Sequence, residues 1–407
     1  MRSLYQAILA SLSALILLAG CAVGPDYAPP SQYSLQLPVS FGQPPAGVTE
    51  GAVEVAWWRS FDDPALTSLV QRALAANHDV GIAAARLDEA KALLGESRQG
   101  LLPSGGSSLS YENRRRSEVE TAPGQPHRTE SYRGAVDASW EIDLFGRVRR
   151  SVEAAQAQAG SRAALLHGVQ ASVAAAVAAT WFELQGVEAE LAVVTDIRQS
   201  QRESLRLVEG LVKAGSANEL DRLRAEGLLR SVEVAVPELE RRRSAFTNAL
   251  AVLLGEAPQA FTPPAATLAH ETLRVKTIAV GDPATLLARR ADIAAAERKL
   301  AAATAQIGVE IAGLYPEMQV QGSIGFVAGS LSAMSGAAAL SSAISPVIRW
   351  SLLDTGRVRA RIAASEARAM ATFDTPRRKT IVLPTPSRST RISSPLTPKV
   401  PVRWARA

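Results

Sequence analysis

The sequence has little of the chemistry on which enzymes and metalloproteins depend. It contains one cysteine and four histidines among 407 residues, and aromatic residues make up only 5% of the chain. A single cysteine excludes a disulfide framework. The histidines are scattered without ligand spacing, and the sequence has neither a nucleophile elbow nor a phosphate-binding loop. We therefore expect no catalytic residues, no metal site and no bound cofactor.

Long hydrophobic runs are also scarce, and the clearest one lies at the N-terminus. The apolar stretch from Ala7 to Ala19 follows Arg2 and is shorter than the about 20 residues that span a bilayer. It leads into Ala19-Gly20-Cys21, where small residues precede the only cysteine. This pattern predicts a lipoprotein signal peptide at residues 1–20, with a lipid on Cys21 that anchors the chain. Ala22, where Asp would oppose onward sorting, favours the outer membrane.

The positive net charge of +5 comes entirely from the C-terminal end. Residues 375–407 hold eight Lys or Arg and no acid, which leaves 36 basic against 39 acidic residues before them. The main fold is therefore not a basic surface of the kind that binds nucleic acid.

The same C-terminal end is rich in proline, and the helical pattern stops at about Phe373, so we predict a disordered tail at 374–407. Two explanations are open for this tail. It is either a native basic extension, which could act on anionic surfaces, or out-of-register translation after a frameshift. The break falls inside a predicted helix, which favours the frameshift.

An internal repeat organises the chain. The segment 140–149 recurs as 350–359 with an offset of 210, and two matches further upstream have an offset of 213. Each unit predicts a helix, a Gly-x-x-Pro break, a strand, a loop, a second strand, a Gly-Arg turn and another helix. The turns are Gly146-Arg147 and Gly356-Arg357. The predicted divisions are an extended segment at 21–64, repeat 1 at 65–255, a linker at 256–283 and an incomplete repeat 2 at 284–373.

Apolar and polar residues alternate along the predicted strands at 132–144, 318–326 and 344–352. A half-buried sheet of a soluble protein has the same period. The predicted outer-membrane localisation and a strand length of about 10 residues favour the wall of a membrane β-barrel instead. Four strands are too few to close a barrel, so several chains must contribute.

The predicted helices are unusually long. More than 60 residues without proline separate Gly146 from Gly215, and a helix of that length would reach about 95 Å. Its apolar residues follow a coiled-coil spacing. A second helix returns after Gly215, with a kink expected at Pro237 and an end at Gly255.

These motifs together resemble the outer-membrane factor family of tripartite efflux systems, in its lipidated NodT-type branch. The residues that carry the resemblance are Cys21, Trp57–Pro64, Asp143–Arg147, Asn248–Gly255 and Arg289–Ile293, in which Ala291 replaces the usual Pro. The resemblance implies a TolC-like membrane β-barrel continued by a long α-helical coiled-coil barrel, built as a homotrimer. It also implies passive export of drugs, metals or other small molecules, with a periplasmic adaptor (membrane fusion protein) and an inner-membrane RND pump as partners.

The resemblance also assigns a role to one tip of the helical tunnel. The family's Gly-x-x-x-x-x-Asp turn matches Gly215–Asp221, which would place Asp221 near the periplasmic aperture. A helix N-terminal charge is an equally good explanation of Asp221. The repeat predicts a second tip at about residue 425, beyond Ala407, so we expect a protomer without the second tip's latch. The alternatives are a truncated channel without function and a lipid-anchored periplasmic helical scaffold without a pore.

Overall fold

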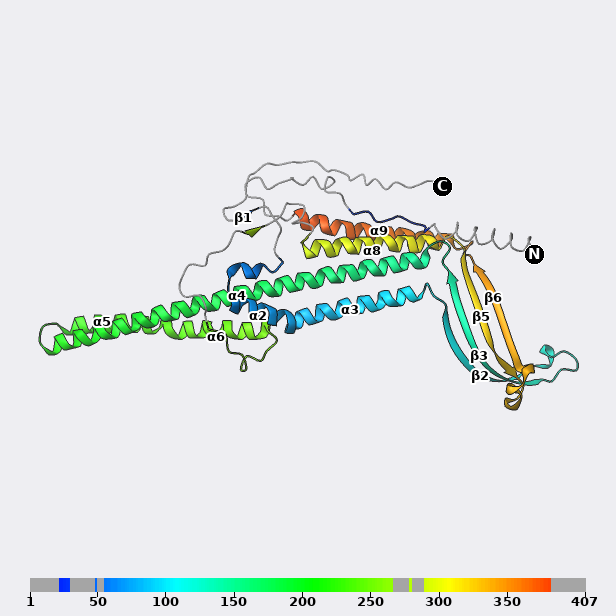
Figure 1. Ribbon diagram of the computed structural model, residues 1–407, viewed down its shortest axis with the longest axis horizontal. Coiled ribbons are helices and arrows are strands. Elements are labelled where there is room, and N and C mark those ends of the chain that lie inside the picture. The colour runs from blue at the N-terminus through cyan, green and yellow to red at the C-terminus, as the bar shows by residue number, and fades with distance from the viewer. Residues whose placement is uncertain (1–21, 30–47, 50–54, 266–277, 280–288, 382–407) are drawn as a thin grey trace, which may run out of the picture.

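The computed structural model describes residues 22–29, 48–49, 55–265, 278–279 and 289–381, with only the backbone described for 48–49, 278–279 and 374–381. The molecule is long, with a four-stranded sheet at one end and a helical hairpin at the other (Figure 1). The predicted signal peptide, Cys21, most of the linker and residues 382–407 lie outside the described residues.

Most of the described helices lie in the predicted repeat 1. Its main elements are α2 (Pro64–Ala76), α3 (His78–Gln99), β2 (Ser104–Arg115), β3 (Arg128–Ile142), α4 (Arg147–Lys213), α5 (Glu219–Glu233) and α6 (Ala235–Leu253). Repeat 2 contains α8 (Ala291–Ala312), β5 (Glu317–Ala328), β6 (Leu340–Arg349) and α9 (Thr355–Ile381). The minor elements are the parallel pair β1 (Val48–Thr49) and β4 (Ile278–Ala279), and the 3₁₀ helices η2 (Trp57–Phe61), η3 (Glu118–Glu120), η4 (Leu331–Ser335) and η5 (Ala337–Ala339).

Helix α4 confirms the long helix predicted between the two glycines. It has 67 residues, a length of about 100 Å at 1.5 Å per residue. Gly146 precedes it with φ +82°, and Gly215 follows it with φ +75°, both in the left-handed region that favours glycine. Among the described helices, α4 alone is long and apolar enough to cross a membrane by length and composition.

The returning helix is interrupted as predicted. Helix α5 ends at Glu233 and α6 begins at Ala235, because Pro237 has no N–H to donate to the carbonyl of Glu233. Gly255, with φ +70°, follows the end of α6. On α5 the side chains of Leu220, Leu223 and Leu228 are exposed in the single chain, whereas Leu229 is buried.

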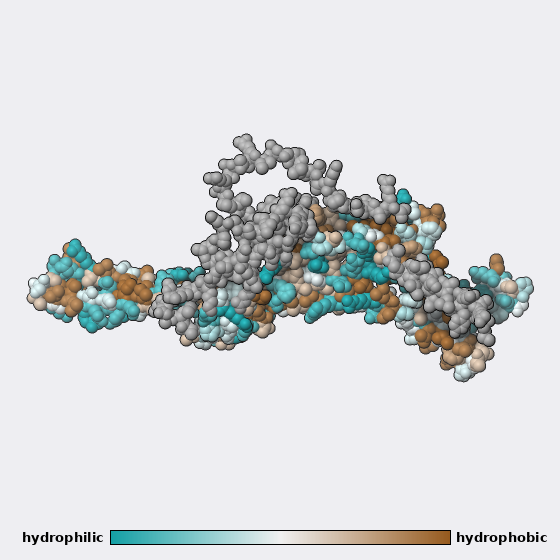
Figure 2. All heavy atoms as spheres, turned by 45° about the horizontal axis from the view of Figure 1, so that its top comes forward, coloured by the Kyte–Doolittle hydropathy of each residue, from teal (hydrophilic) through white to brown (hydrophobic). Residues whose placement is uncertain are grey.

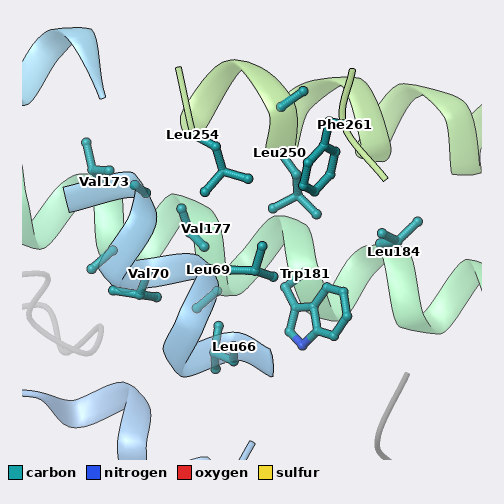
Figure 3. Packing of buried hydrophobic residues seen from close by; sticks show 14 of the residues in the cluster. Leu66, Leu69, Val70, Val173, Val177, Trp181, Leu184, Leu250, Leu254 and Phe261 are labelled. Atoms are coloured by element: carbon teal, nitrogen blue, oxygen red, sulfur yellow. The ribbon is translucent and has the colours of Figure 1, made fainter. Parts of the chain in front are cut away.

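A compact core lies where α2, α4 and α6 meet (Figure 3). Its largest member is Trp181, which is fully buried and donates through Nε1 to Oδ2 of Asp63 over 2.7 Å. The other carboxylate oxygen of Asp63 accepts from the backbone N–H groups of Ala65 and Leu66, capping α2. One buried carboxylate therefore joins the start of α2 to the middle of α4.

The sheet has the order β2-β3-β5-β6, and all its pairs are antiparallel. The central pair, β3 with β5, joins the two repeats. Its register places Val136 opposite Ile324 and Trp140 opposite Val320.

The predicted helix end near Phe373 is wrong. Helix α9 continues to Ile381, so its backbone is helical through Pro376. Proline removes its own N–H donor and leaves the other hydrogen bonds of the helix in place, so a proline does not by itself end a helix.

Candidate functional site

The sheet presents two faces of opposite character. The strand register brings the apolar residues of all four strands to one face, and most of these side chains are exposed. The members of this apolar face are Leu109, Tyr111, Tyr132, Val136, Trp140, Met318, Val320, Ile324, Phe326, Leu340, Ile344 and Ile348. The side chain of Ile344, for example, is 81% exposed. Hydrophobic residues gather at the sheet end of the molecule in Figure 2. A soluble sheet would bury such a face.

Aromatic residues lie at both ends of the apolar face. Tyr111 and Tyr132 pack with ring centroids 4.8 Å apart at the end away from the helices. Trp140 and Trp350 lie near the helices. The eight residue-to-residue steps from Tyr132 to Trp140 span about 27 Å along the strand. A strand tilt of about 40° reduces this to about 21 Å, close to the apolar band of a membrane barrel between its aromatic girdles.

The opposite face of the sheet is polar and concave. It forms a trough of about 480 Å³ lined by residues of all four strands, among them Ser104, Asp137, Gln321 and Ser345. Asp137 accepts from Ser108 Oγ over 3.1 Å and pairs with Arg133.

The cross-strand contacts of the polar face continue toward the helices. Gln319 donates to Ser139 Oγ over 2.7 Å and accepts from Arg349 over 2.7 Å. Hydrogen-bonding groups that remain open to water are what the wall of an aqueous passage requires.

The first Gly-Arg turn joins the sheet to the long helix. Arg147 makes a two-pronged ion pair with Glu141 at the end of β3. The carboxylate of Asp143 accepts from the backbone N–H groups of Val148 and Arg149 over 3.1 and 2.9 Å, capping α4. Two carboxylates therefore fix the direction in which α4 leaves the sheet.

The second Gly-Arg turn has a different geometry, although the repeat predicts equivalence. Gly356 lies inside the first turn of α9, and nothing would contact a Cβ at this position. Arg357 pairs with Asp354 over 3.2 Å instead of reaching a strand. The glycine is required at the first turn and not at the second.

Asp221 lies at the far tip, where α4 turns into α5. Its carboxylate accepts from the backbone N–H of Asn218 over 3.3 Å, and the Asn218 side chain accepts from the N–H of Asp221 over 3.0 Å. This reciprocal pair is a capping box. The helix-terminal interpretation of Asp221 therefore has direct support, while its role at an aperture stays a prediction.

Sequence reasoning missed Arg150. Its side chain is buried beside the first Gly-Arg turn and contacts residues 23, 24 and 26. The only signal in the sequence is the second arginine of the pair after Val148. Nothing in the repeat identifies its contact with the N-terminal segment, because the equivalent residue is Ala360.

Comparisons with known proteins agree with this geometry. The family model "Outer membrane efflux protein" matches residues 69–256 and 283–381. Nodulation protein T of Rhizobium leguminosarum bv. trifolii is 30% identical over 368 residues, covering 88% of this chain and 75% of that protein. The solvent efflux pump outer membrane protein SrpC of Pseudomonas putida is 30% identical over 358 residues, covering 87% and 75%.

A solved structure of the outer-membrane channel OprN has the same fold. It is 33% identical and superposes with a TM-score of 0.76, covering 89% of this chain and 80% of that one. The long helices, the sheet with an exposed apolar face and these matches lead to one conclusion. The chain belongs to the outer membrane efflux protein family, whose members are channels of the outer membrane and not enzymes.

Proposed function

We propose that three copies of this chain form the outer-membrane channel of a tripartite export system, through which drugs, metals or other small molecules pass without catalysis. The observation that carries the proposal is the two-faced sheet with two open edges. Among the described residues no further strand pairs with the outer side of β2 or of β6, so these two edges can accept a neighbour. Pairing β6 of one copy with β2 of the next closes a barrel of twelve strands and leaves no edge.

The two faces fit this arrangement. In a closed barrel, the exposed apolar face contacts lipid and the polar trough lines the passage. The alternative of a periplasmic scaffold without a pore leaves the exposed apolar face unexplained. A four-stranded sheet with that face in water is an aggregation hazard.

The helices supply the connection to the partners. Helix α4 is several times longer than a bilayer is thick, and its tip lies far from the sheet (Figure 1). This tip is the proposed contact for a periplasmic adaptor, which in turn joins an inner-membrane RND pump. Relatives named as efflux pump outer membrane proteins support the part of this proposal that assigns the chain to a pump.

A lipid on Cys21 is the proposed anchor of each protomer. Ala22, the next residue, lies at the turn where the sheet meets α4, with its Cα 2.7 Å from the position of a Cβ on Gly146. The lipid would therefore lie at the helix end of the apolar face. It assists placement of the barrel, which spans the membrane without it.

The barrel is tested by placing one charge on either face of β6. Ile344→Lys puts a charge on the lipid side, where it costs about 2–4 kcal/mol near the bilayer centre. Ser345→Lys puts the same charge on the trough side. A membrane barrel resists unfolding in detergent until it is heated, so its mobility on gels is heat-modifiable. We expect Ile344→Lys to abolish heat-modifiable trimers in outer membranes. Ser345→Lys should retain these trimers and change their conductance in a planar bilayer.

Equal tolerance of both variants would contradict the barrel. Wild-type protein without heat-modifiable mobility would favour the scaffold. A trimer that inserts but conducts nothing would identify a channel without function.

A further inference from the structure

The segment that begins at Ala22 docks at the junction of sheet and helix. Val23 donates its backbone N–H to the carbonyl of Phe145 over 3.0 Å, in the turn that precedes α4. Ala22 packs against Gly146 so closely that a Cβ there would lie 2.7 Å from the Cα of Ala22. The segment therefore occupies space that only glycine leaves open.

Arg150 holds this segment from one side. Its side chain is 5% exposed. The guanidinium donates to the carbonyls of Val23 and Gly24 over 3.2 and 3.3 Å, and to Asp26 over 2.7 Å. A buried guanidinium is costly unless its five N–H groups find acceptors. Two of its acceptors are main-chain carbonyls, so the contact depends on the path of the segment more than on its side chains.

Glu153 orients the same guanidinium. It lies one turn along α4 and accepts from Nη1 of Arg150 over 2.8 Å. The other nitrogens, Nε and Nη2, are those that bind the segment. The planar guanidinium is thus held between its own helix and the docked segment.

Helix α8 of repeat 2 packs against the other side of the segment that begins at Ala22. Gly24 has φ +98°, and a Cβ on it would lie 2.5 Å from the Cα of Gly308 in α8. A Cβ on Gly308 would in turn lie 2.9 Å from Cγ of Arg150. The segment passes between α4 of repeat 1 and α8 of repeat 2, through a gap made by two glycines.

We propose that Arg150 is a positioning residue, which together with the glycine gap fixes the start of the mature chain at the sheet–helix junction. A lipid on Cys21, one residue before Ala22, then leaves the protein at the helix end of the apolar face, at a set depth. This inference rests on the proposed lipidation of Cys21, and it adds the element that decides where the lipid lies.

Hydrogen–deuterium exchange on the purified full chain tests whether Arg150 holds the segment 22–29 in place. The variants are Arg150→Ala, Arg150→Lys and Asp26→Ala, with Arg206→Ala, an exposed arginine of the same helix, as the matched control. We expect Arg150→Ala to speed exchange of peptides covering 22–29 at least about tenfold. Arg150→Lys should give partial rescue, because lysine keeps the positive charge but lacks the planar set of donors of a guanidinium. Asp26→Ala has a small effect because the Asp26 side chain is exposed.

Exchange in the core of α4, around Trp181, separates positioning from general stability. Positioning predicts that this core stays unchanged in every variant. Loosening of the core together with 22–29 would reduce Arg150 to a structural role and overturn the inference, as would rapid exchange of 22–29 in the wild type.

The mass of the N-terminal peptide is read in the same experiment. The added mass of a lipid on Cys21 is expected in the wild type and in all variants. If the added mass is absent while 22–29 is still protected from exchange, the lipidation of Cys21 and the proposed depth of the lipid are overturned. The positioning of the segment by Arg150 would then still stand. If the added mass is present while 22–29 exchanges rapidly, only the positioning role of Arg150 is overturned.

Discussion

Trp140 and Trp350 donate the same hydrogen bond in the two repeats. Nε1 of Trp140 donates to the carbonyl of Leu101 over 3.1 Å, and Nε1 of Trp350 donates to that of Leu314 over 3.0 Å. Each acceptor lies in the Gly-x-x-Pro break that leads into the first strand of its repeat. The duplication visible in the sequence is therefore preserved in an individual contact.

This equivalence predicts equal effects of equal changes. Trp140→Phe and Trp350→Phe should each lower the stability of the sheet end by about 1 kcal/mol, since each removes one hydrogen bond and little apolar surface. The thermal midpoint of the trimer-to-monomer transition on gels measures this. Clearly unequal losses for the two variants would contradict the argument.

The two glycine turns predict opposite outcomes for one substitution. Gly146→Ala should destabilise the protein by more than about 1 kcal/mol, because φ is positive there and Ala22 occupies the space of the new Cβ. Gly356→Ala should be neutral or slightly stabilising, because alanine favours the helix and meets nothing. Chemical denaturation of both variants gives the comparison. Similar losses would mean that the turns are equivalent after all.

Asp221→Asn separates capping from conduction. Asparagine retains an acceptor for the backbone N–H of Asn218, so we expect the stability of α5 to change little. If Asp221 lies at the aperture, loss of its charge should lower the cation-to-anion permeability ratio at least about twofold. Reversal potentials in a planar bilayer measure this, with Asp88→Asn on α3 as the control. Unchanged selectivity would leave Asp221 as a helix cap only.

Acid should weaken the α4–α5 hairpin. The guanidinium of Arg202 on α4 hydrogen-bonds to Glu233 on α5 over 3.0 Å and holds the pKa of that carboxyl below its usual range. A carboxyl whose pKa is lowered on folding contributes stability above its unfolded pKa of about 4.3, and this contribution is lost as pH falls through the folded value.

Thermal melts followed by circular dichroism between pH 6 and pH 3 measure this loss. Glu233→Gln should reduce the pH dependence, whereas Glu96→Gln, an exposed carboxylate on α3, should leave it unchanged. An identical pH slope in wild type and Glu233→Gln would exclude a role for this ion pair.

The sequence by itself predicted the repeat, and it determined the helix from residue 147 to residue 213 and the family. These features depend on local information: the spacing of apolar residues, the glycines that end helices and the proline that interrupts one. The alternation in β3 and β5 likewise predicted the two faces of the sheet, because side chains on a strand alternate whatever its neighbours are.

Only the tertiary structure decided what these elements do to one another. It paired β3 with β5 across the repeats, made Gly146 indispensable and Gly356 not, and brought residues 22–26 between Arg150 and Gly308. It also continued α9 past Pro376. Close approach between segments more than 100 residues apart depends on packing, which leaves no periodic signal in either segment. The same repeat motif therefore received two different environments, and only one of them includes the segment that follows Cys21.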